Sequence, residues 1–147
     1  MPDSPAEIGT EFILFTRANS NQKQYISYKD TKTIKQSSFN RNLPLKILIH
    51  GFSNTIEKPW LHEMKDELLK VGDFNVIIVG WGDGCTFPDY TRAASNIRTV
   101  AKELNLLLTS IQDIFNIHTN AYKIHCIGHS LGELILKDAY LLRNISN

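Results

Sequence analysis

The sequence lacks the features that mark several classes of protein. Its 147 residues include only two cysteines, no internal repeat and no low-complexity segment, which argues against a disulfide-stapled mini-protein or a fibrous repeat. No apolar run reaches the roughly 18 residues that a membrane span needs. An excess of charge is also missing, because 16 basic residues face 15 acidic ones and leave a net charge of +1. We therefore expect no strong attraction to nucleic acid or to an anionic membrane.

The amino terminus lacks a secretory signal, since residues 1–5 have neither a basic start nor an apolar stretch. We expect either an intracellular protein or a sequence that begins after such a signal. Cys126 lies in an apolar run and is predicted to be buried, whereas Cys85, in a loop rich in Gly, Pro and Asp, could form a disulfide with a partner elsewhere. No Cys-x-x-Cys motif or histidine cluster is present, so neither a metal nor another cofactor is expected.

The remaining composition, 42% hydrophobic and 21% charged, is ordinary for one globular domain. Short apolar runs alternate with segments of helical periodicity, which predicts a mostly parallel sheet covered by helices on both faces. The polar stretch 29–44 is expected to be an exposed connection. The predicted strands are 11–16, 25–28, 45–49, 74–79 and 122–127, and the predicted helices are 59–70, 91–116 and 131–142.

The last predicted strand runs directly into Gly128-His129-Ser130-Leu131-Gly132, and a helix follows. This G-x-S-x-G pattern is typical of a nucleophile turn, on which the Ser130 hydroxyl stands exposed above the sheet. The tight turn leaves no room for side chains two residues away on either side, which explains the two glycines. At the start of the helix, the Leu131 N–H can bind a developing oxyanion. The alternative is a simple glycine-rich turn between a strand and a helix.

A second pattern, His50-Gly51-Phe52, follows the predicted strand 45–49. Hydrolases that transfer an acyl group through a serine need a second oxyanion donor from a loop after an upstream strand. The Phe52 N–H is the natural candidate. The alternative is an ordinary strand-to-helix loop with a phenylalanine in the core.

Four separated segments resemble motifs of the pancreatic-lipase family, in that family's order: KILIHGF at 46–52, VIIVGW at 76–81, YTRAASNIR at 90–98 and IHCIGHSLG at 124–132. The family includes secreted triacylglycerol lipases and arthropod phospholipases A1. The resemblance covers about residues 5–132 and implies an α/β-hydrolase fold, secretion, and hydrolysis of a lipid ester at a lipid–water interface. It also implies roles for single residues: Ser130 as nucleophile, Phe52 and Leu131 as oxyanion donors, and His50, Gly51, Gly128, His129 and Gly132 in support.

Two departures from the family pattern stand out. Gly80 replaces the usual aspartate before the tryptophan, and the sequence diverges over 133–147. In this fold the acid and then the histidine of the triad follow the serine, yet no histidine follows Ser130. Glu133 and Asp138 lie on a predicted helix rather than at a strand end. Neither a triad acid nor a triad base is therefore expected among these residues, and none of the five histidines is expected to replace the base: His50, His62, His118, His125 and His129.

We therefore expect a partial α/β-hydrolase domain over residues 1–147, truncated after the nucleophile turn and inactive alone. The strand 122–127 should form an exposed sheet edge. The helix 131–142 should keep an uncovered apolar side, and the chain should be marginally stable. That apolar side comprises Leu134, Ile135, Tyr140 and Leu141.

Three functions are compatible with this pattern. The first is a fragment or alternative transcript product of a secreted lipase or phospholipase A1, whose intact form hydrolyses lipid esters through an acyl-enzyme on Ser130. The second is a non-catalytic homologue that binds lipid or protein. The third, a nucleotide-binding domain, is supported only by the glycines at 80–84, which lack both the dinucleotide spacing and a Walker lysine. The choice between triacylglycerol and phospholipid stays open.

Overall fold

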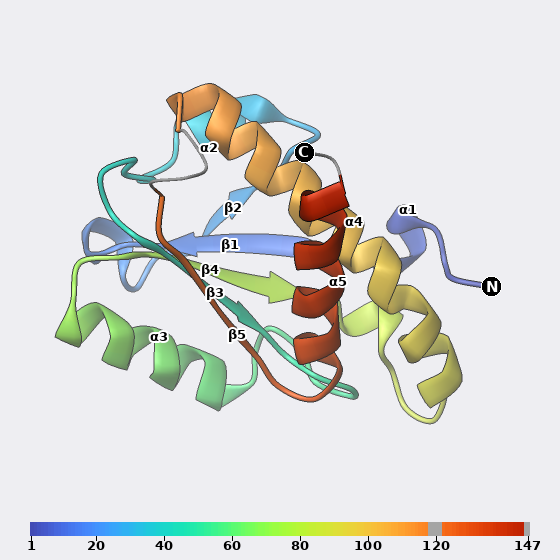
Figure 1. Ribbon diagram of the computed structural model, residues 1–147. Coiled ribbons are helices and arrows are strands. Elements are labelled where there is room, and N and C mark those ends of the chain that lie inside the picture. Colours follow the sequence, from blue (N-terminus) through green and yellow to red (C-terminus); the bar gives the residue numbers. More distant parts are fainter. Residues whose placement is uncertain (118–121, 146–147) are drawn as a thin grey trace.

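The computed structural model describes residues 1–117 and 122–145, and it contains a five-stranded sheet with helices on both faces (Figure 1). The elements in chain order are α1 (Pro5–Ile8), β1 (Glu11–Phe15), the 3-10 turn η1 (Arg17–Asn19), β2 (Gln24–Ile26), α2 (Thr31–Lys35), β3 (Leu45–Ile49), α3 (Pro59–Val71), β4 (Asn75–Gly80), the 3-10 turn η2 (Gly82–Gly84), α4 (Tyr90–Phe115), β5 (Ile124–Gly128) and α5 (Leu131–Ile145).

The strands lie in the order β2-β1-β4-β3-β5. The three strands β4, β3 and β5 run parallel, whereas β1 is antiparallel to β4 and β2 is antiparallel to β1. Ile49 at the end of β3 is level with Val79 on one side and Gly128 on the other. The carboxyl ends of β3 and β5 are therefore adjacent, and the predicted α/β class with a mostly parallel sheet is confirmed.

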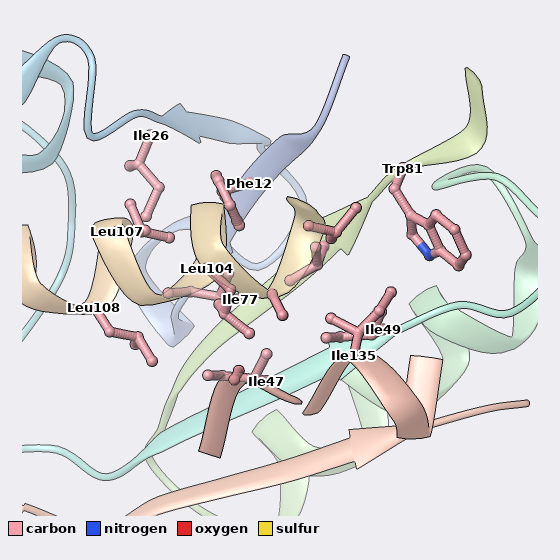
Figure 2. Packing of buried hydrophobic residues seen from close by; sticks show 14 of the residues in the cluster. Phe12, Ile26, Ile47, Ile49, Ile77, Trp81, Leu104, Leu107, Leu108 and Ile135 are labelled. Atoms are coloured by element: carbon pink, nitrogen blue, oxygen red, sulfur yellow. The ribbon is translucent and has the colours of Figure 1, made fainter. Parts of the chain in front are cut away.

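Side chains alternate between the two faces of the sheet, as expected for strands buried on both sides. On one face, Phe12, Ile47 and Ile77 pack against α4 and α5, and Figure 2 shows Leu104 and Leu107 of α4 beside Phe12 and Ile26. On the other face, Ile13, Phe15, Leu48, Val76 and Ile78 pack against α3 through Leu61 and Leu69. The helix α3 is the green helix in Figure 1.

The stretch 29–44 differs from the prediction of an exposed connection. Asp30 accepts a hydrogen bond from the Lys32 N–H and starts the short helix α2. Ile34 is fully buried, and Phe39 stacks on Phe115 with ring centroids 4.9 Å apart. Most of the stretch is exposed or partly exposed, as predicted, and the prediction was wrong only for Ile34 and Phe39, two isolated apolar residues that anchor the polar stretch to the core.

The prediction that Cys126 is buried was wrong. Cys126 is exposed, because it lies on β5 at the edge of the sheet. Cys85 is fully buried and free, and its Sγ lies 3.6 Å from the Asn54 carbonyl oxygen. Neither cysteine forms a disulfide within the part of the chain that the structure describes.

The edge formed by β5 agrees with the prediction, since residues 124–126 are exposed. Leu134, Tyr140 and Leu141 on α5 are 45%, 68% and 48% exposed, as predicted. Ile135 is instead fully buried in the core, because it points toward β3 (Figure 2). Along residues 1–117 and 122–145, no helix is both long and apolar enough to cross a bilayer.

Candidate active site

The parallel pairing of β3 and β5 brings the two predicted motifs together. The His129 N–H donates a hydrogen bond of 3.1 Å to the Ile49 carbonyl oxygen, which extends the ladder beyond both strand ends. Gly51 then passes directly over the serine turn: a Cβ on Gly51 would lie 2.7 Å from the Cβ of Ser130 and 2.6 Å from the His129 carbonyl oxygen. Only glycine fits this close approach of two backbones.

Ser130 has a left-handed backbone conformation, with φ +56°, and its side chain is exposed. A residue with a side chain in this region is strained by about 1 to 3 kcal/mol. The turn is closed by hydrogen bonds of 3.0 Å from the Gly132 N–H to the His129 oxygen and from the Glu133 N–H to the Ser130 oxygen. Gly128 packs against the backbone of residues 132–133, where a Cβ would lie 2.5 Å from the Glu133 nitrogen. This is the geometry of an exposed serine on a sharp strand-to-helix turn.

Two backbone N–H groups beside the serine turn are unpaired. The Ser53 N–H donates to the Cys85 oxygen and the Gly132 N–H to the His129 oxygen, each in a bond of 3.0 Å or less. The N–H groups of Phe52 and Leu131, the residues directly before Ser53 and Gly132, form no hydrogen bond with any residue in 1–117 or 122–145. Both predicted oxyanion donors are thus available to a ligand.

His50 anchors the loop before Phe52. It is fully buried, and its Nε2 accepts a hydrogen bond of 3.0 Å from the Trp81 N–H. Its Nδ1 must then carry the proton, which it donates to the Gly51 oxygen at 3.0 Å. The Trp81 indole returns a bond of 2.9 Å to the His50 oxygen. Burial lowers the pKa of His50, so the imidazole is neutral and serves to position the loop.

Two aromatic residues that the sequence did not single out lie at the rim of the site. Tyr90, at the start of α4, contacts Phe52 edge-on with ring centroids 5.2 Å apart. Trp60, near the start of α3, lies 5.7 Å from the His129 ring. Trp60 follows the helical stripe of α3, so its sequence signal is that of a core residue. Each ring thus packs against a residue of one of the two motifs.

No side chain in the described ranges hydrogen-bonds to the Ser130 hydroxyl, and no cluster of three metal-binding side chains occurs in them. Glu133 is exposed and Asp138 half-buried, both on α5. The other histidines have partners elsewhere. His62 contacts the Ile56 oxygen at 2.8 Å, and His125 is exposed, with its Nδ1 3.1 Å from Lys46 Nζ. His118 lies outside the described residues.

Comparison with known proteins shows which family the chain is similar to. The family model described as "Lipase" matches residues 1–135. The chain belongs to the pancreatic-lipase family. It is 37% identical over 132 residues to pancreatic lipase-related protein 2 of Cavia porcellus and 37% identical over 139 residues to pancreatic triacylglycerol lipase of Mus musculus. It is also 34% identical over 139 residues to inactive pancreatic lipase-related protein 1 of Homo sapiens.

These matches cover 90% to 95% of the chain but only 29% to 30% of each relative. The chain thus spans under a third of the length of these pancreatic-lipase relatives. Their names include a lipase and a protein called inactive at similar identity. Membership of the pancreatic-lipase family confirms the resemblance and the α/β fold. It does not by itself decide whether this chain is active.

Proposed function

We propose that Ser130 is the nucleophile of a lipid carboxylic-ester hydrolase, with the Phe52 and Leu131 N–H groups as its oxyanion donors. The observation that carries the proposal is the contact between Gly51 and Ser130, which holds two unpaired N–H groups beside an exposed, strained serine. Family membership supports an ester of a lipid as the substrate. Relatives named as pancreatic lipases support secretion and action at a lipid–water interface.

In the proposed reaction, Ser130 Oγ attacks the ester carbonyl carbon and the negative charge moves to the carbonyl oxygen. The Phe52 and Leu131 N–H groups stabilise that oxygen. A base takes the serine proton and returns it to the departing alcohol, which leaves an acyl-serine that water then hydrolyses. No histidine follows Ser130 in residues 1–147, and no described side chain hydrogen-bonds to its hydroxyl. We therefore expect this chain alone to lack turnover.

A non-catalytic homologue that binds lipid or protein is the second candidate. The unpartnered Ser130 hydroxyl favours it, as does the similarity to relatives named inactive. This function predicts that emulsified lipid binds the chain without releasing fatty acid under any condition. It therefore differs from the first in one measurable respect, the response to an added base.

Imidazole can serve as that base. Without imidazole, the 147-residue chain should release butyric acid from a tributyrin emulsion only at the background rate. In concentrated imidazole the rate should rise at least tenfold, which is about one-tenth of the smallest rise that a positioned base typically gives. Ser130→Ala should abolish the rise. Ser53→Ala is the matched control, because Ser53 is also exposed with a positive φ of 58° on the neighbouring loop.

An imidazole-dependent rate that survives in Ser130→Ala would contradict the proposal. Lipid binding by a folded chain with no rate at any imidazole concentration would favour the non-catalytic homologue. Circular dichroism of each variant establishes that folding is unchanged. Parallel assays on an emulsion of short-chain phosphatidylcholine compare phospholipid with triacylglycerol as substrate.

A further inference from the structure

Gly51 and Phe52 share one peptide group, to which Gly51 contributes the carbonyl oxygen and Phe52 the N–H. This peptide is trans, so the C=O and N–H bonds point in opposite directions. The Gly51 oxygen accepts hydrogen bonds from His50 Nδ1 at 3.0 Å and from the Asn54 N–H at 3.3 Å. Contacts that fix this oxygen therefore also fix the direction of the Phe52 N–H, which is unpaired among the described residues.

The turn at residues 51–54 does not hold its conformation alone. Ser53 has a φ of +58°, in the left-handed region that strains a residue with a side chain. Such a conformation persists only where the surrounding structure imposes it. The hydrogen bond that closes the turn, from the Asn54 N–H to the Gly51 oxygen, measures 3.3 Å, which is slightly long for this type of bond. The turn therefore depends on contacts with a neighbouring segment.

Cys85, directly after the 3-10 turn η2, makes such contacts. Its carbonyl oxygen accepts a hydrogen bond of 2.8 Å from the Ser53 N–H. Its Sγ lies 3.7 Å from the Gly51 oxygen and 3.6 Å from the Asn54 oxygen, at the two ends of the turn. A thiol is a weak hydrogen-bond donor. Cys85 is fully buried, so bulk water does not compete for these contacts.

We propose that Cys85 is a positioning residue for the Phe52 oxyanion donor, because it holds the turn 51–54 with the Gly51 oxygen facing the protein interior. This inference rests on the proposed function for the role of the Phe52 N–H. The Cys85 Sγ also lies 3.7 Å from the Gly82 oxygen, and its single hydrogen can bond to only one of the three oxygens at a time. Burial raises the pKa of the Cys85 thiol, so it keeps this hydrogen at neutral pH.

Cys85 is itself firmly placed, as a positioning residue must be. Its N–H donates a hydrogen bond of 3.2 Å to the Gly82 oxygen. The oxygen of the preceding residue, Gly84, accepts a bond of 2.9 Å from Nδ2 of Asn96, which is fully buried on α4. Gly84 also packs closely on Ile8, since a Cβ on Gly84 would lie 2.8 Å from Ile8 Cγ2. The segment under the turn is thus fixed to α1 and α4.

NMR of the 147-residue chain tests the contact without requiring catalysis. The Gly51 13C′ and Phe52 15N signals belong to the peptide group whose oxygen Cys85 contacts, so both should shift in Cys85→Ala. Cys85→Ser retains a hydroxyl donor and should shift them less. Cys126→Ala is the matched control, because it removes the exposed cysteine on β5 and should leave both signals in place.

Labelling of Ser130 by a fluorophosphonate in imidazole tests the consequence. Cys85→Ala should lower the maximal labelling rate at least tenfold, less than the roughly 10² to 10³-fold loss that follows removal of a whole oxyanion donor. The probe concentration that gives half the maximal rate should not change, because the donor acts on charge that develops only in the transition state. Cys85→Ser should lose less of the rate than Cys85→Ala. Circular dichroism establishes that each variant is folded.

The proposal is overturned if the Gly51 and Phe52 signals stay in place in folded Cys85→Ala or Cys85→Ser. It is also overturned if the Ala and Ser variants lose the labelling rate equally, since both lose the sulfur and only serine keeps a donor. A parent chain that gains no label at Ser130 contradicts the proposed function instead. The NMR comparison then decides alone whether Cys85 positions the Gly51–Phe52 peptide.

Discussion

Gly51 and Ser130 meet at the carboxyl ends of β3 and β5, so closely that a Cβ on Gly51 would lie 2.7 Å from the Ser130 Cβ. The loop that carries the Phe52 N–H and the turn that carries the serine are thus one packed unit. The hydrogen bond from the His129 N–H to the Ile49 oxygen also connects them.

The first prediction concerns Gly132. A Cβ at this position would lie 2.6 Å from the Ile49 oxygen and 2.8 Å from the His50 oxygen, both backbone atoms that cannot rotate away. Gly132→Ala should therefore lower the free energy of unfolding by about 1 to 3 kcal/mol, the usual cost of overpacking. Urea denaturation followed by circular dichroism measures this change.

Gly82→Ala is the matched control, since a Cβ there would meet its nearest atom, Thr55 Cγ2, at 3.4 Å. Its effect should stay within about 0.5 kcal/mol. Equal destabilisation by the two substitutions would contradict the packing described for Gly132.

The second prediction concerns acid sensitivity at His50. Burial holds its pKa below the ordinary 6.5, so below pH 6.5 the unfolded chain binds a proton that the folded chain does not. The contribution of His50 to stability is complete above pH 6.5 and is lost as the pH falls below it, by at most about 1.4 kcal/mol per pH unit. His50→Gln should flatten the decline in urea midpoint between pH 6.5 and 5.

His125→Gln removes an exposed imidazole from β5 and controls for the loss of a histidine as such. If it flattens the pH dependence as much as His50→Gln does, the burial of His50 is not the source of the acid sensitivity.

Long periodic segments were predictable from the sequence. β3 has the predicted bounds, and α4 begins and ends within one residue of the prediction, because an apolar stripe maintained over many turns is a strong local signal. The motifs around Ser130 and His50 were also predictable, because each is a short run of neighbouring residues directly after a strand.

Features that depend on distant neighbours were not predictable. Cys126 has the local sequence of a buried strand residue and is exposed only because β5 is the edge strand. Ile34 and Phe39 lie in a polar stretch and are buried by contacts with elements far along the chain. Glu103 has the sequence signal of a solvated helix residue, and only tertiary packing shows it to be buried.

The third prediction concerns the free edge at β5. Its backbone groups are open to pairing with another chain, and Ile124 adds an exposed apolar side chain there. The chain should self-associate as its concentration rises, and Ile124→Lys should reduce that association several-fold because a charge on an edge opposes pairing. Sedimentation velocity over a concentration series measures the effect.

Val71→Lys removes a more exposed apolar side chain, at the end of α3 and away from β5, and should leave the association unchanged. A parent chain that stays monomeric throughout the series would refute the prediction, as would equal protection by both substitutions.

The identity of the nucleophile is tested most directly by a fluorophosphonate probe, with the labelled residue located by peptide mass spectrometry. In the presence of imidazole, the 147-residue chain should gain a single adduct at Ser130. The adduct should be lost in Ser130→Ala and kept in Ser53→Ala. An adduct at Ser53, or labelling that Ser130→Ala leaves undiminished, would contradict the assignment of Ser130.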